Sequence, residues 1–352
     1  MLRSVPQLSP CTASLLHSIL SSEPLFSNNM AFRASDNLQC YIRGAKLPAM
    51  AYRSPRSEPW SYHVSFNVRP ERYRKLRLVH TINATPFSDI ISDWVEEFVP
   101  SKSLGVNDED EHTGERLTIP CEPFFSIVPL PLVRAEDIER VFVWLDMFPL
   151  ESTRRILNLL YGNSNSWKFL PSEEQPFLKT LTWSYSKSEQ DKTISQDALC
   201  LFLMPPWLLS AKDLQEFARG QAFPDRSAPD SLGDEAQSTL HGMEWLWSKV
   251  WDACICRDCP WFIVTTYTHW VFGVFSAGWT ASFVSPLYAF DSHMPTVLEV
   301  LVYWLISAMG YPGGFVLPDI SHESVHRRRL LVATPRDISR DEPAEALQST
   351  LL

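Results

Sequence analysis

The sequence predicts an α+β fold in which helices pack on a small mixed or antiparallel sheet and a helical part lies N-terminal to it. Residues 262–290 contain no Asp, Glu, Lys or Arg, are rich in Val, Thr, Phe, Tyr and Trp, and divide into segments of strand length. An apolar run of similar length occupies 198–204. Apolar residues recur at helical spacing before the uncharged stretch, at 243–254, and after it, at 295–310.

The uncharged stretch has two interpretations, a sheet or a membrane span. The expected strands lie near 198–204, 262–266, 271–276 and 280–285. A helix of about 20 apolar residues would be long enough to cross a bilayer. However, Gly273 and Gly278 weaken a helix, and no cluster of Lys or Arg flanks one side of the stretch. The sequence therefore favours strands, with membrane association through 262–308 as an alternative.

Composition divides the chain into four expected regions. They are a disordered leader at 1–55, a strand and helical-hairpin region at 56–165, a Trp-rich α+β domain at 166–318, and a disordered charged tail at 319–352. The leader is rich in Ser and has no acidic residue before Glu23, as in mitochondrial transit peptides, but early prolines interrupt a helix. Seven of the 13 tryptophans fall between Trp245 and Trp304, so this part is expected to dominate the core.

The first elements after the leader follow from their periodicity. Residues 60–68 alternate between apolar and polar side chains, which is typical of a strand. A helix is expected from Ser88 to Phe98, and a proline ends it. Residues 101–116 form an acidic loop that lacks the ligand spacing of a calcium-binding EF-hand, so a solvated loop is favoured.

A helical hairpin is expected next. An apolar stripe from Ile138 to Phe148 forms its first arm, Pro149 breaks the chain, and STRRILNLLYG forms the second arm. Arg154 and Arg155 raise the alternative of a DNA-reading helix, but packing within a hairpin is favoured on an acidic chain.

The second half contains one polar segment and two well-marked helix starts. Residues 163–196 are polar, and no strand or helix is predicted there, although Trp167, Phe169 and Trp183 are expected to anchor them. Ser210, three residues before Asp213, predicts a capped helix over SAKDLQEF. Pro295 is expected to open the last helix and a glycine to end it.

The C-terminal block resembles a family of uncharacterised proteins from mushroom-forming fungi. The resemblance covers about residues 197–310 and is carried by the segments PPWLLSAKDLQEF, MEWLWSKVWDACICRDCPWFIVTTYTHWVFGVFSAGWTASFVSP and PTVLEVLVYWLISAMG. It implies no known activity.

The order of elements in this block also resembles the closing half of PD-(D/E)XK nuclease-like domains. That family holds Mg²⁺ with an Asp and a Glu-x-Lys motif on adjoining strands. The resemblance implies Asp197 as the acidic position, but Met204-Pro205-Pro206 stands where Glu-x-Lys would be expected. A divergent Mg²⁺-dependent nuclease-like enzyme is therefore an alternative function.

The cysteines give the sharpest local cluster. Cys254, Cys256 and Cys259 are close enough in sequence to hold zinc, with a histidine such as His269 as a further ligand. Because Cys254 and Cys256 point about 200° apart on a helix, the three thiols converge only if the helix unwinds before Cys256. An ordinary helix end is therefore favoured over a metal site, and no bound cofactor is expected.

His269 is the second catalytic candidate beside Asp197. It is expected in a turn between two apolar strands, where a general base could lie, although a histidine that caps the turn is the simpler interpretation. No nucleophile elbow, phosphate-binding loop or dinucleotide fingerprint is present. Exposed Trp207, Trp245 or Trp279 could stack on sugars or bases, but core packing is the default for each.

These observations favour a non-catalytic interaction or scaffold protein with a protein partner. The net charge of −10 argues against broad attraction to nucleic acid or anionic lipid. Seven cysteines in a long chain indicate reduced, intracellular usage, in the cytoplasm or the nucleus, with mitochondrial import as an alternative. His326-Arg327-Arg328-Arg329 resembles a nuclear import signal, although a solvated tail is the commoner explanation.

Overall fold

The structure is a computed structural model. It describes residues 37–52, 74–105, 112–114, 116–119, 121, 134–162, 166–175, 177–189, 192–223, 243–318 and 320. The chain divides into two units, 1–33 and 34–352, and every described residue belongs to the second. The strand expected at 60–68, the basic run at 326–329, and most of the leader and tail lie outside the described residues.

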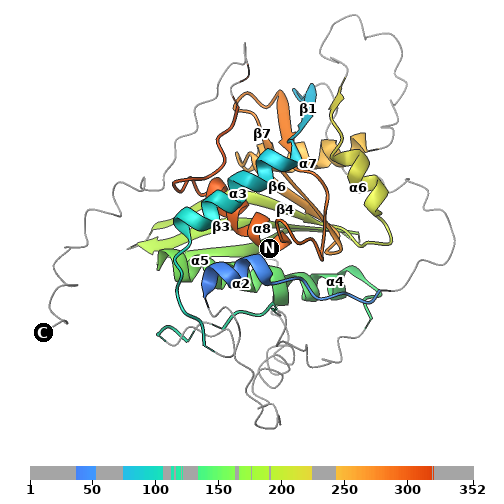
Figure 1. Cartoon of the computed structure of the whole chain (residues 1–352). Coiled ribbons are helices and arrows are strands. Elements are labelled where there is room, and N and C mark those ends of the chain that lie inside the picture. The colour runs from blue at the N-terminus through green and yellow to red at the C-terminus, as the bar shows by residue number, and fades with distance from the viewer. Residues whose placement is uncertain are drawn as a thin grey trace, which may run out of the picture. The chain divides into compact units, whose positions relative to one another are not determined.

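The predicted α+β fold is confirmed, with a sheet larger than expected. Among the described residues a mixed sheet of nine strands runs in the order β2-β3-β4-β6-β7-β8-β1-β5, and β9 pairs with β7 (Figure 1). The strands are β1 (Leu78–Thr81), β2 (Trp167–Gln175), β3 (Leu178–Glu189), β4 (Lys192–Leu203), β5 (Gln221–Ala222), β6 (Trp261–Thr265), β7 (His269–Phe275), β8 (Ala281–Val284) and β9 (Tyr288–Ala289). All four expected strands are present as β4, β6, β7 and β8.

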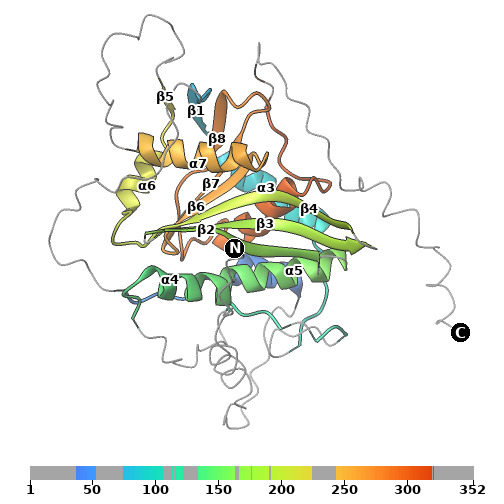
Figure 2. The ribbon, with the colours of Figure 1, turned by 180° about the vertical axis from the view of Figure 1, so that it is seen from behind.

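Helices cover both faces of the sheet. They are α2 (Leu38–Gly44), α3 (Ala84–Phe98), α4 (Ile138–Leu145), the π-helical turn η2 (Asp146–Leu150), α5 (Glu151–Tyr161), α6 (Ala211–Phe217), α7 (Glu244–Cys256) and α8 (Val297–Ala308). In Figure 2, α7 lies on one side of the long strands and α4 and α5 lie on the other. None of the described helices is both long and apolar enough to cross a membrane.

Alternation along the central strands creates two cores. In β4, Leu199, Leu201 and Leu203 pack with α8, whereas Cys200 and Phe202 pack with α6 and α7. The same division recurs in β6 and β7, because both faces of these strands are buried. This explains why the stretch that contains them is uncharged: each side chain must enter one core or the other. Residues of both regions predicted to fold, 56–165 and 166–318, contribute to the α8 core.

The last helix is confirmed, but it begins later than expected. Thr296, not Pro295, is its N-cap: the Thr296 hydroxyl accepts from the Glu299 N–H, and the Glu299 carboxylate accepts from the Thr296 N–H. The reciprocal pair satisfies two of the amide groups that a helix start leaves free. The capped start at Ser210 and Asp213, predicted in the same way, is also present.

The predicted helical hairpin is wrong. α4, η2 and α5 follow one another without a break from Ile138 to Tyr161, and Pro149 lies inside the π-helical turn. Proline cannot donate the hydrogen bond that an α-helix requires, and one wider turn accommodates the missing donor without ending the helix. The apolar stripe of both segments therefore faces the same core.

The polar segment at 163–196 is also different from the prediction. It forms β2, β3 and the start of β4, which pair as long antiparallel strands. Leu181 and Trp183 enter the core, while Thr180, Thr182 and Ser184 occupy the alternate positions. The polar residues therefore belong to one face of a sheet. In composition alone, the segment resembles a loop.

The predicted leader extends too far. Leu38–Gly44 form α2, because Asn37 caps it by accepting from the Cys40 N–H, and Leu38, Tyr41 and Ile42 are buried. α3 likewise begins at Ala84, earlier than the predicted Ser88. Of the apolar stripe expected to face the core, Ile91, Trp94 and Val95 are buried, whereas Phe98 is 36% exposed.

Candidate functional site

The carboxyl ends of the parallel strands β4 and β6 lie next to each other. The Met204 N–H donates to the Thr265 carbonyl at 3.0 Å, so pairing continues to the end of both strands. In sheets with parallel strands, ligands bind preferentially beyond these ends. The segments that follow, 205–209 and 266–268, are therefore the first place to look for a site.

Three threonine hydroxyls hold the turn between β6 and β7. The Thr265 hydroxyl accepts from the Tyr267 N–H at 2.9 Å and donates to the His269 carbonyl at 3.0 Å. Thr266 Oγ1 accepts from the His269 N–H at 3.2 Å and lies 3.0 Å from Thr268 Oγ1. These bonds stabilise a tight turn in which Tyr267 has a φ of +69°, a conformation that a bulky residue rarely adopts.

His269 is the first residue of β7 and lies half-buried beside this turn. Its Nδ1 is 3.1 Å from Thr268 Oγ1. Burial lowers the pKa of His269 below 6.5, and the carboxylate of Asp291 opposes that shift only in part. The imidazole is therefore neutral near pH 7 and is able to accept a proton.

Tyr267 connects the turn to α4 and to the segment at Pro48. Its buried hydroxyl donates to the Pro48 carbonyl at 2.8 Å, and its ring lies 5.7 Å from that of Trp144 in an edge-on contact. Because Trp144 belongs to α4, this helix is fixed at the carboxyl end of the parallel strands.

α4 exposes one large apolar side chain, Val143, among charged residues such as Glu139 and Arg140. We name the residues around it, together with those at the carboxyl end of β4, the α4 surface. It comprises Tyr52, Glu139, Phe142, Val143, Lys179 and Trp207. Tyr52 pairs with Ala135 just before α4, and its ring lies 6.4 Å from that of Trp207, in the loop after β4. Val143 and Tyr52 are 42% and 38% exposed, and Trp207 is half-buried.

Lys179 and Glu139 set the charge of the α4 surface. The Lys179 ammonium lies 2.8 Å from Glu139 Oε1 and 5.2 Å above the centre of the Phe142 ring. The Lys179 side chain is only 6% exposed, whereas that of Glu139 is 67% exposed. The charge that the surface presents to solvent is therefore a carboxylate, although the pair itself is neutral.

Of the three tryptophans considered for stacking, Trp207 alone retains substantial exposure. Trp245 and Trp279 are buried in the core beneath α6 and α7. The sequence offered no signal that separates the three.

Asp197 lies near the middle of β4, two residues before the parallel pairing with β6 begins. It accepts a hydrogen bond from Ser184 on β3 at 2.6 Å, and its Oδ2 is 3.9 Å from Arg257 Nε. The resemblance implied a lysine beside this carboxylate, and the cation found here is an arginine. Asp197 and His269 lie at opposite ends of the parallel pair, so the structure does not bring the two catalytic candidates together.

The three clustered cysteines do not converge. α7 continues through Cys256, so the unwinding that convergence required does not occur, and Cys256 is exposed while Cys254 and Cys259 are buried. The helix ends in a Schellman motif: the Cys259 N–H donates to the Cys254 carbonyl, and Asp258 has a φ of +49°. A Schellman motif commonly brings the side chains at these two positions into contact, which accounts for the spacing of Cys254 and Cys259. No group of three or more His, Cys, Asp or Glu within the described parts of the chain is arranged to hold a metal ion.

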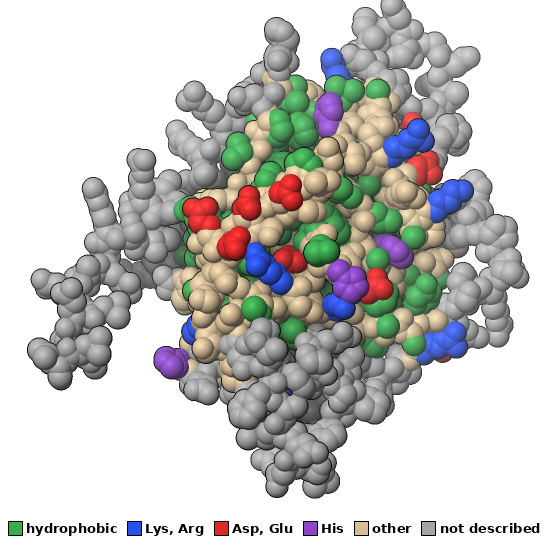
Figure 3. Space-filling model, viewed as in Figure 1, with side chains coloured by type: hydrophobic (Ala, Val, Ile, Leu, Met, Phe, Trp, Pro, Cys, Tyr) green, Lys and Arg blue, Asp and Glu red, His purple; other side chains and the backbone are tan. Residues whose placement is uncertain are grey.

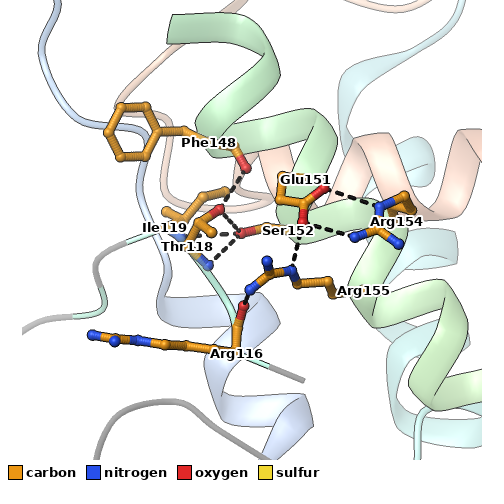
Figure 4. Close-up of polar contacts among 8 residues, drawn as sticks. All are labelled: Arg116, Thr118, Ile119, Phe148, Glu151, Ser152, Arg154 and Arg155. Atoms are coloured by element: carbon orange, nitrogen blue, oxygen red, sulfur yellow. Dashed lines mark hydrogen bonds and ion pairs between the residues drawn. The ribbon is translucent and has the colours of Figure 1, made fainter. Parts of the chain in front are cut away.

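Arg154 and Arg155 are engaged within the helix rather than presented to DNA. Both donate to the Glu151 carboxylate, and Arg155 also donates to the Arg116 carbonyl (Figure 4). Burial alone would raise the pKa of Glu151, but the two arginines hold that pKa below its usual value. This arrangement ties the start of α5 to the segment at 116–119.

An acidic face lies on the solvent side of α3. Asp89, Asp93, Glu96 and Glu97 are exposed there, and α3 contains no Lys or Arg. Figure 3 shows acidic side chains gathered where α3 crosses this face. The nearby Arg43 donates to the Ser92 carbonyl at 3.2 Å, which holds α2 against α3.

The chain matches no protein-family profile, no curated protein and no solved structure.

Proposed function

We propose that this chain is a non-catalytic interaction protein that binds a segment of another protein on the α4 surface. The observation that carries the proposal is the exposure of two large apolar side chains, Val143 on α4 and Tyr52 before it, the second of which lies against Trp207 at the carboxyl end of β4. Accessible aromatic side chains are enriched in protein-binding sites.

The chemistry of the surface indicates the partner. Lys179 is buried against Glu139, so the charged group of this pair that an incoming segment reaches is the carboxylate. The net charge of −10 favours a basic partner over an acidic one. We therefore expect a segment with large apolar side chains next to a Lys or Arg that pairs with Glu139.

The surface is also held rigidly, which lowers the entropic cost of binding. Tyr267 contacts α4 through Trp144, and Val141 and Leu145 of α4 are fully buried in the core. A partner would therefore meet a preformed helix face.

The test is a selection of displayed peptides on the immobilised full-length chain, followed by titration calorimetry with one selected peptide. We expect enriched peptides that combine aromatic or aliphatic residues with Lys or Arg, and a dissociation constant in the micromolar range. Val143→Asp is expected to weaken binding at least tenfold. The matched control is Val316→Asp, because Val316 is 84% exposed but lies outside the α4 surface.

Glu139→Gln tests the proposed charge contact separately. It should weaken binding of the same peptide and reduce the salt dependence of the affinity. Peptides that bind Val143→Asp as tightly as the unchanged chain, or peptides without basic residues, would contradict the proposal.

Intracellular placement, in the cytoplasm or the nucleus, is part of the proposal. It is supported by the cysteines, since all six in the described part of the chain carry free thiols, as is usual in a reducing compartment.

A second candidate function, hydrolysis centred on His269, is favoured by one observation. A neutral imidazole lies 3.1 Å from the Thr268 hydroxyl, which is the arrangement of a base beside a nucleophile. Turnover of an ester or nucleic-acid substrate that is lost in His269→Ala but retained in the exposed control His293→Ala would support it. The absence of such turnover in the intact chain leaves the binding function as the better account.

A further inference from the structure

Two tyrosine rings stack on each other where α5 and α8 end. Tyr161 is the last residue of α5, and Tyr311 lies three residues after the end of α8. The centres of the two rings are 4.0 Å apart, and their planes differ by 12°. Two phenols therefore lie face to face, although they belong to segments that are far apart in the sequence.

The backbone at each tyrosine is fixed by the end of its helix. The N–H of Gly162, which follows Tyr161, donates at 2.9 Å to a carbonyl in the last turn of α5, and Gly162 has a φ of +57°. The N–H of Tyr311, which follows Gly310 with its φ of +75°, donates at 3.0 Å to a carbonyl near the end of α8. Glycines with positive φ commonly end helices in this way. Because both rings also pack against the α8 core, the fold itself holds the stack together.

Both phenols of the stack are within reach of an oxidant in solution. Tyr161 and Tyr311 are each half-buried, whereas Tyr267 and Tyr303 are fully buried. Burial raises the pKa of both stacked tyrosines, so the two phenols are neutral near pH 7. Each phenol must therefore release its proton when it loses an electron, and water at the exposed part of the ring can accept that proton.

We propose that Tyr161 and Tyr311 form a cross-linking site, at which one-electron oxidants join α5 to the segment after α8 through a dityrosine bond. Each of two oxidant molecules takes one electron from one phenol, and the hydroxyl proton passes to water, which leaves two tyrosyl radicals. The radicals combine at ring carbons next to the C–O carbons, and one C–C bond forms. Each of these ring carbons then loses its hydrogen as a proton while the attached C–O oxygen gains one, which restores both phenols. Overall, two tyrosines lose two electrons and two protons, and two oxidants are each reduced by one electron.

The stacked arrangement favours this coupling over reaction with other tyrosines. Since the rings already lie face to face, a short slide of one ring over the other brings the reacting carbons together without a change in the backbone. The new bond would connect two segments that are distant in the sequence. Such a link restricts the unfolded chain and therefore raises the melting temperature.

The experiment oxidises the folded full-length chain with tris(bipyridyl)ruthenium(III), generated by a brief light flash, at a low protein concentration. The monomer is then isolated, so that links between chains are left out, and its melting temperature is recorded. Trypsin and a glutamate-specific protease release residues 156–168, in which Tyr161 is the only tyrosine, and residues 300–323, which contain Tyr303 and Tyr311. Fragmentation of the linked pair identifies the tyrosine of 300–323 that has reacted.

We expect a linked pair that joins Tyr161 to Tyr311 and has lost two hydrogen atoms, and a melting temperature several degrees above that of the untreated chain. Tyr161→Phe and Tyr311→Phe keep a stacked ring but lack the phenol, so each should abolish the link. The matched control is Tyr303→Phe, because Tyr303 lies on the same peptide as Tyr311 but is buried against Phe87 and Trp94. This variant should form the link as the unchanged chain does.

Two results would overturn the proposal. The first is an oxidised monomer of the unchanged chain in which Tyr161 and Tyr311 are not joined, and this result requires no substitution. The second is a link from Tyr161 to Tyr303 in place of Tyr311.

Discussion

The ring of Phe262 occupies the space directly above Gly273. The two residues face each other across β6 and β7, and a Cβ atom at position 273 would lie 2.1 Å from Phe262 Cζ. The Trp304 indole N–H lies within hydrogen-bond distance of the carbonyls of both residues, at 3.2 and 3.3 Å. The pair therefore fixes how α8 packs on the centre of the sheet, and only glycine fits at position 273.

Gly273→Ala is expected to destabilise the protein by about 1–3 kcal/mol, because the added methyl overlaps the Phe262 ring. Chemical denaturation measures the change in the free energy of unfolding. Phe262→Leu removes the overlapping ring atoms, so the double variant should lose less stability than the sum of the two single variants. Simple additivity would show that the two residues do not interact as described.

The ion pair between Arg74 and Asp252 is expected to matter more than any exposed pair. Both side chains are about nine-tenths buried, and the two bonds, from Arg74 Nε and Nη2, are 3.0 and 2.9 Å long. Arg74→Gln leaves the Asp252 carboxylate buried without its cation, and we expect a loss of about 3–5 kcal/mol.

Arg140→Gln is the matched control for this change. Arg140 is 43% exposed and lies 3.8 Å from Asp137, which is itself 55% exposed. Exposed pairs of this kind contribute less than about 1 kcal/mol. Equal losses of stability in the two variants, measured by the same denaturation, would contradict the structure around Arg74.

His269 is expected to make the protein less stable in acid. Burial lowers its pKa in the folded chain, so the unfolded chain binds a proton more readily. The stability that the neutral imidazole provides is present above a pH of about 6.5 and is lost as pH falls through the folded pKa. His269→Gln should therefore show a smaller decline in the free energy of unfolding between pH 7 and pH 5. Parallel profiles for the two chains would count against this assignment.

Thr296→Ala tests the start of α8. The Thr296 hydroxyl accepts from the Glu299 N–H at 3.1 Å and donates to the Ile42 carbonyl at 2.9 Å, so it caps α8 and also holds the end of α2. We expect a loss of about 1–2 kcal/mol in thermal or chemical unfolding. Thr296→Ser keeps the hydroxyl and should stay close to the unchanged chain; a serine variant as unstable as the alanine variant would argue against the cap.

The central elements were predictable because burial on both faces leaves a plain sequence pattern. The uncharged residues of β6 and β7 and the helical spacing of Trp247, Val250 and Trp251 each have one interpretation that fits a packed core. Local caps such as Ser210 with Asp213 were predictable for a similar reason, since both partners lie within one turn.

The sequence did not predict β2, β3 or the π-helical turn. In each case tertiary contacts, strand pairing for β2 and β3 and packing for the turn, outweighed the local sequence signal. Leu181, Trp183 and Tyr185 do alternate with Thr and Ser, and this period of two is the signal that would have found β3. Pro149 normally ends a helix, and only the packing of η2 and α5 on the core retains it within one.

The candidate sites depend on contacts that sequence spacing does not contain. Cys254 and Cys259 are related by local spacing, but Cys200 shares their core only because β4 packs beside α7. Val143 belongs to a helical apolar pattern and is indistinguishable in sequence from a core residue, although it is exposed. The α4 surface therefore became visible only once the chain was folded.

Photo-crosslinking locates peptide binding at the α4 surface in a single experiment. Benzoylphenylalanine replaces Val143 in one full-length chain and Val316 in another, and each is irradiated with a peptide selected on the unchanged protein. We predict a covalent adduct of the peptide with the chain labelled at position 143 and none with the chain labelled at 316. Equal adducts from both positions, or an adduct from 316 alone, would contradict it.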